Sequence, residues 1–121
     1  MRYTNTKLEG TVVDLTLLTE VMNKHHFVLA GQWDYERVTY DYKFEMLKDV
    51  YYLRIQGFAI EGDIGGRHAN IKLLTPLLGK HYYPHGVEYG EDEDFPKNVL
   101  QKSEQLLQSI EKELQDLAII E

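Results

Sequence analysis

The chain contains no cysteine, which excludes disulfide bonds, thiolate nucleophiles and cysteine-based zinc sites. Its only serines, Ser103 and Ser109, both lie in the amphipathic segment near the C-terminus, so none is expected on a tight turn beside a histidine base. The phosphate-binding patterns G-x-x-x-x-G-K-[ST] and G-x-G-x-x-G are missing as well. These absences disfavour covalent and nucleotide chemistry and leave other enzyme activity open, and we assign no catalytic residue, no cofactor and no metal ligand.

Long apolar runs are also lacking. No stretch reaches the roughly 18 apolar residues that a membrane-spanning helix needs, and residues 1–7 include no apolar signal segment. The net charge of −7 disfavours binding to nucleic acid or to anionic lipid. With 121 residues and a hydrophobic fraction of 43%, the sequence predicts one cytoplasmic domain, 1–121, with a real core.

The most informative passage is 37–60, where two runs alternate with a period of two. This pattern predicts a β-hairpin with a two-residue turn at Lys48-Asp49. One face is then apolar in both strands. The expected opposite pairs are Met46–Tyr51, Phe44–Leu53, Tyr42–Ile55, Tyr40–Gly57 and Val38–Ala59.

The remaining elements follow from local patterns. We expect a strand at 8–13, a helix at 14–25 capped by Asp14, strands at 27–33 and 68–74, an irregular segment at 77–94, and a helix that starts at Pro96. The stripe of this last helix is Val99, Ser103, Leu106, Leu107, Ile110, Leu114 and Leu117. The predicted fold class is α+β, in two layers. An antiparallel sheet of four to five strands carries two helices on one face, in the order β-α-β-β-β-β-α.

Two segments resemble the YugN-like family, which comprises small proteins of bacilli and their relatives. They are AGQWDYERVTYDYKFE at 30–45 and GDIGGRHAN at 62–70. The resemblance implies a small bacterial α+β fold of unassigned function. It transfers no catalytic or ligand residue to this chain.

Three groups of polar residues are candidate ligand sites, although each has a simpler structural explanation. His81, His85 and Glu88 offer two imidazoles and a carboxylate to a metal, but Pro84 separates the histidines. Glu88 and the cluster 91–94 lack the alternating pattern of a calcium loop and suit a solvated turn before a helix. The glycines of 62–68, with Arg67 and His68, could present amides to an anion, or they simply form a strand connection.

The outer face of the predicted sheet is the least ordinary feature, because it mixes polar and apolar side chains. Such a face is typical of a contact with a partner, unless the segment 77–94 covers it. His25 and Trp33 are more simply core or rim residues. The polar members are Asp41, Lys43, Glu45, Arg54, Gln56, Asn70 and Lys72, and the apolar members are Val28, Ala30, Tyr52, Phe58, Ile60 and Leu74.

Three functions compete. The leading hypothesis is a non-catalytic interaction module, in one version a homodimer through the outer sheet face. The alternative is a small-molecule-binding protein or enzyme with a pocket near 77–89, using His81, His85, Glu88 and Arg67. The third is nucleic-acid binding, which rests only on the likeness of the element order to the TATA-binding-protein repeat and which the acidic balance opposes.

Overall fold

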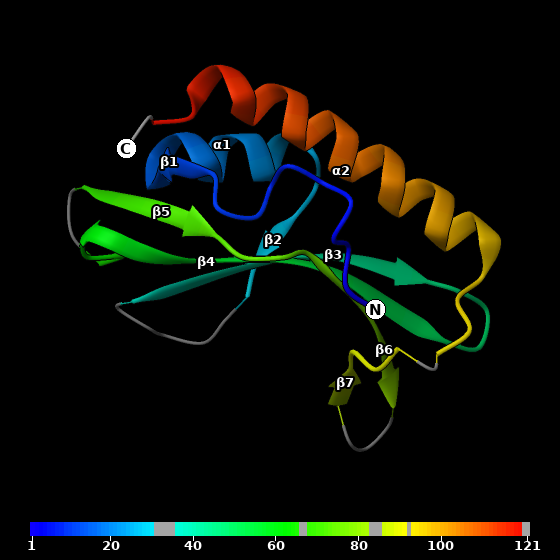
Figure 1. Cartoon of the computed structure of the whole chain (residues 1–121). Coiled ribbons are helices and arrows are strands. Elements are labelled where there is room, and N and C mark those ends of the chain that lie inside the picture. Colours follow the sequence, from blue (N-terminus) through cyan, green and yellow to red (C-terminus); the bar gives the residue numbers. More distant parts are fainter. Residues whose placement is uncertain (31–35, 66–67, 83–85, 92, 120–121) are drawn as a thin grey trace.

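The protein is described here by a computed structural model that covers residues 1–30, 36–65, 68–82, 86–91 and 93–119. An antiparallel sheet forms one layer and two helices form the other, both on the same face of the sheet (Figure 1). The strands are β1 (Val12–Asp14), β2 (Val28–Leu29), β3 (Arg37–Glu45), β4 (Val50–Gly62), β5 (Ala69–Leu73), β6 (Leu77–Tyr82) and β7 (Gly86–Glu88). The helices are α1 (Leu15–Lys24) and α2 (Lys97–Leu117). The predicted α+β fold class is confirmed.

The sheet has seven strands among the described residues, where four to five were expected. The prediction that 77–94 is irregular is wrong, because this segment contains β6 and β7. The main strand order is β1-β5-β4-β3-β2, and β6 pairs with the first half of β4 while β5 pairs with the second half. Between the Gly57–Leu73 and Arg54–Leu77 pairs β4 advances three residues and the other strand four. The strands β5 and β6 thus follow β4 along the same edge one after the other, with one extra residue in the connection 74–76 between them.

The core lies between the sheet and the helices. Tyr40, Leu53 and Ile55 of β3 and β4 are fully buried, and Phe44 is nearly so. Tyr42 is half-buried, with its ring centroid 4.8 Å from that of Phe44. The prediction that these five side chains share one layer beneath the helices is confirmed.

The hairpin exists, but its predicted register is wrong by two residues. Phe44 lies opposite Tyr51 and Val38 lies opposite Gly57, and the connection is the four-residue loop 46–49, in which the Met46 amide donates to the Asp49 carbonyl at 2.9 Å. A shift of two leaves every side chain on its predicted face, because the side-chain period of a strand is two. Gly57 is therefore not beneath Tyr40.

Gly57 allows the close approach of β5. A Cβ at this position would lie 2.4 Å from Cγ2 of Ile71, closer than side chains pack. The glycine lets the buried side chains of β5 lie directly against the backbone of β4.

Both helices follow their sequence signals. The Asp14 side chain accepts a hydrogen bond from the Leu17 amide at 3.2 Å, as predicted for the cap of α1. In α2 the whole predicted stripe is buried except Leu117, which is partly buried. Pro96 occupies the N-cap, one position earlier than expected. Glu113 of α2 pairs with Lys24 and, at 2.8 Å, with His25 Nε2, and so joins the two helices.

Candidate interaction surface

Both helices lie on one face of the sheet (Figure 1). The outer side chains of β3, β4 and β5 lie on the other face. The register places residues of neighbouring strands in rows on this face. One row is Val28–Asp41–Arg54, and the next is Lys43–Tyr52. These strand residues all lie on the face that the sequence predicted, although their cross-strand partners differ from the predicted ones. Of their apolar members, Val28 is 68% exposed, while Tyr52 and Phe58 are half-buried.

An ion pair occupies the middle of this outer face. Arg54 Nε donates to Asp41 Oδ1 at 2.8 Å, and Arg54 Nη2 donates to Asp41 Oδ2 at 2.9 Å. The hydrogen bonds to Asp41 raise the pKa of Arg54, so the guanidinium stays charged and fixed in a two-pronged geometry. The face thus presents a rigid, neutralised centre between apolar side chains.

Tyr89 covers one end of this centre. Its ring centroid lies 5.3 Å from Arg54 Cζ, and burial raises the pKa of Tyr89 to about 12. Gly79 makes the position possible, because a Cβ there would lie 2.6 Å from ring atoms of Tyr89. The segment 77–94 therefore covers part of the face, as one of the two explanations foresaw. The side of the face toward β2 stays open.

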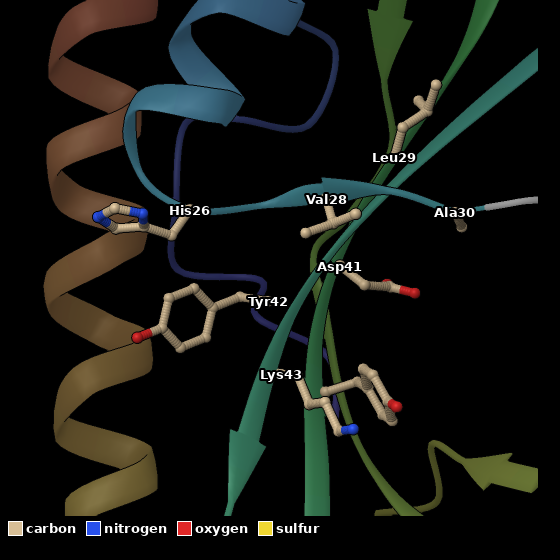
Figure 2. A pocket seen from close by; sticks show the side chains of 8 residues that line it. His26, Val28, Leu29, Ala30, Asp41, Tyr42 and Lys43 are labelled. Carbon is tan, nitrogen blue, oxygen red and sulfur yellow. The ribbon is translucent and has the colours of Figure 1, made fainter.

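A groove of about 490 Å³ lies at this open side, where the short strand β2 ends beside β3. Figure 2 shows that the groove passes around the sheet edge: His26 and Tyr42 lie on the helix side of β3, and Asp41 and Lys43 on the outer side. Apolar and aromatic groups dominate the lining, with one imidazole, one carboxylate and one ammonium group. The complete lining is His26, Val28, Leu29, Ala30, Asp41, Tyr42, Lys43 and Tyr52.

His26 has an unusual backbone conformation for its residue type. Its φ is +66°, the left-handed conformation that glycine normally supplies after a helix. The Phe27 amide donates to the Met22 carbonyl at 2.9 Å and the His26 amide to the Asn23 carbonyl at 3.1 Å, which together form a Schellman motif. A strained residue that lines a groove is a reason to consider the groove functional.

The metal site proposed from His81, His85 and Glu88 is not assembled by the described residues. His81 lies opposite Val87 and Lys80 lies opposite Glu88, so adjacent positions send His81 and Glu88 to different faces of the β6–β7 hairpin. His85 and Arg67 lie outside the described residues. In the described part of the chain, no three histidine, aspartate or glutamate side chains gather around a common point that would suit a metal.

Two members of the acidic cluster and one residue of the glycine loop make contacts within the chain. Glu91 accepts from the Arg2 amide at 3.2 Å, whereas Glu93 accepts from the Tyr82 hydroxyl and lies 3.5 Å from Lys80 Nζ. His68 Nδ1 of the glycine loop lies 3.3 Å from a carboxylate oxygen of Asp14, which disfavours an anion there. Asp92, Gly66 and Arg67 lie outside the described residues.

Sequence reasoning missed three members of the open edge: His26, Leu29 and Leu47. Leu29 is 55% exposed, and Leu47, in the hairpin loop, is 99% exposed. The sequence did contain a signal for Leu47, because a leucine that is exposed at a turn adds nothing to the stability of the fold. The expected two-residue turn concealed it by placing Leu47 inside the strand.

Comparison with known proteins establishes the family. The model of the YugN-like family matches residues 3–113, and the chain belongs to this family. The crystal structure of the uncharacterized conserved protein YugN from Geobacillus kaustophilus HTA426 has the same fold, with a TM-score of 0.85 and 46% identity over 97% of this chain and 96% of that one.

Two curated proteins of Bacillus subtilis (strain 168) are also similar. The uncharacterized protein YlbA is 54% identical over 110 residues, which cover 91% of this chain and 92% of YlbA. The uncharacterized protein YugN is 27% identical over 81 residues, or 67% of this chain and 60% of that protein. These relatives confirm the predicted resemblance and are themselves of unknown function. Within the described residues, no helix has the length and apolar character needed to cross a membrane.

Proposed function

We propose that this protein is a non-catalytic interaction module that binds another protein through the outer face of its sheet. The observation that carries the proposal is the open outer face, where apolar side chains remain exposed or half-buried around a fixed Arg54–Asp41 pair. Aromatic side chains next to an arginine are typical of the centre of a protein interface. In the version expected from the sequence, the partner on this face is a second copy.

A site-specific crosslinker tests this function, because the chain has no cysteine of its own. Phe58→Cys places a unique thiol on the outer face, and Leu17→Cys places one at a partly exposed apolar position on α1 as the matched control. After attachment of a photoreactive group, we expect crosslinked products in cell extract from position 58 and not from position 17. Equal crosslinking from both positions would remove the support for a face-specific module.

The self-association version has its own measurement. If a second copy binds the outer face, Phe58→Glu or Tyr52→Glu lowers the mass of the purified protein to that of the 14.2-kDa monomer. An unchanged mass in both variants would exclude this version and leave the face for a different partner.

A further inference from the structure

We propose that a second copy of the chain pairs with the open edge of β3, so that two sheets join into one continuous antiparallel sheet. The edge is distinct from the outer face, and the assignment does not depend on what that face binds. β2 pairs only with Tyr40 and Asp41 of β3. Among the described residues no strand pairs with the same side of 42–45, and the groove lies beside this stretch. An unpaired strand edge is a template for a further strand.

The backbone of β3 determines which residues face that edge. The Ala30 amide donates to the Thr39 carbonyl at 2.8 Å on the β2 side, whereas the Glu36 carbonyl accepts from the Ala59 amide at 2.8 Å on the β4 side. Alternate residues of an antiparallel strand point their amide and carbonyl groups the same way. Lys43 and Glu45 therefore present theirs to the open edge.

Charge selects one register for a symmetric pair of edges. A two-fold axis at Lys43 would put two lysines opposite each other, and an axis at Glu45 would put two glutamates opposite each other, which is destabilising. An axis at Phe44 places Lys43 opposite Glu45 of the second copy, twice, and pairs residues whose backbone groups both face the edge. Within one chain Lys43 Nζ lies 3.3 Å from Glu45 Oε1, so both charges are already on the same face.

The same register gives the exposed hairpin loop a place to bind. With the axis at Phe44, the residue opposite position i is 88 − i, so the strand pairing ends where Glu45 lies opposite Lys43 and the loop 46–49 of each copy then reaches the start of β2 in the other copy. Asp41 pairs with Val28 at this end of β2, where the groove lies. The 99% exposed Leu47 of each copy is thus brought to the exposed Val28 of β2 in the other copy. A second copy at this edge thus covers both exposed apolar patches, which are Leu47 in the hairpin loop and the exposed side chains of β2.

This arrangement also has a consequence for the outer face. Residues directly opposite each other in an antiparallel pair lie on the same face of the sheet. The two outer faces therefore lie side by side, and all four helices lie on the other side. A partner of the outer face would meet a surface of twice the width.

Charge reversal tests the register, with mass measured by light scattering over a range of concentrations. We expect a dimer for the wild type and a monomer, or at least about a tenfold weaker dimer, for Lys43→Glu and for Glu45→Lys. The double variant Lys43→Glu with Glu45→Lys restores the dimer, because the charges are again complementary. A mixture of the two single variants forms a heterodimer, since each lysine then faces a glutamate. Both side chains are about half or more exposed, so folding is not at risk.

Two further variants make the result decisive. Leu47→Ser weakens the dimer, while Lys48→Glu in the same loop is the matched control and leaves it intact. A wild type that stays monomeric at all concentrations overturns the proposal, and so do single charge variants that dimerise as well as the wild type. A dimer lost in Phe58→Glu but kept in the charge variants would assign self-association to the outer face instead.

Discussion

Replacement of His26 by glycine should stabilise the protein by about 0.5–1 kcal/mol. A residue with a side chain pays roughly 1–2 kcal/mol for the left-handed conformation, and His26 has a φ of +66°. Glycine has greater conformational freedom in the unfolded chain, and this lowers the gain in the free energy of unfolding by about 0.5–1 kcal/mol. For a domain of this size the net change corresponds to a rise in Tm of roughly 2–4 °C.

The assay is urea unfolding of the wild type, His26→Gly and His26→Ala under identical conditions. The alanine variant is the matched control, because it removes the imidazole but keeps the left-handed strain, and it should bring no gain. If glycine and alanine have the same effect, or if glycine destabilises the protein, then the left-handed conformation of His26 does not lower the stability of the protein. A gain confined to glycine would show that the sequence keeps a costly residue in the groove.

Three other perturbations test the helix contact, the covered end of the outer face and the core. Lys24 lowers the pKa of Glu113 from 4.5, so the advantage of the wild type over Glu113→Gln should be present near neutral pH and shrink as the pH falls below 4.5 in urea titrations. Gly79→Ala should cost about 1–3 kcal/mol, because its Cβ overlaps the ring of Tyr89; an amide NMR spectrum should show Tyr89 displaced. Ile55→Ala should cost about 2–5 kcal/mol in equilibrium unfolding, since Ile55 is fully buried.

Each of these has a contradicting outcome. A pH-independent difference for Glu113→Gln would mean that the ionised carboxylate adds nothing to the contact between the helices. An unperturbed Tyr89 in Gly79→Ala would mean that the ring does not rest on β6. Gln56→Ala, on the outer face beside Ile55, is the control for the core and should change stability by less than Ile55→Ala.

The β3–β4 hairpin shows what the alternation of apolar and polar residues can predict and what it cannot. The period of two in 37–60 identified which face of each strand is buried, and the structure agrees for Tyr40, Phe44, Leu53 and Ile55. It did not identify the register, because a shift of two residues gives the same faces. The loop 46–49 decides the register, and its four residues include no favoured turn dipeptide such as Asn-Gly.

The strands β6 and β7 could not be read from local pattern. Gly79 and Pro84 within this segment are typical of turns and loops, and β6 is too short to show a clear period. What makes 77–82 a strand is the free edge of β4 at Tyr51–Arg54, which is distant in sequence. For the same reason, sequence alone did not show that Gly79 leaves room for Tyr89.

The sequence by itself determined the composition of the two layers: the apolar faces of the strands, the stripe of α2, the Asp14 cap and the absence of any cysteine chemistry. These are properties of residues close together in the chain, where periodicity and capping act. Only the tertiary structure decided which edge of the sheet stays open, that Tyr89 covers Arg54, and that His26, Val28 and Lys43 line one groove. Such features depend on neighbouring strands that come from distant parts of the chain and differ in length. The local sequence of one strand does not encode the residue at which the neighbouring strand ends.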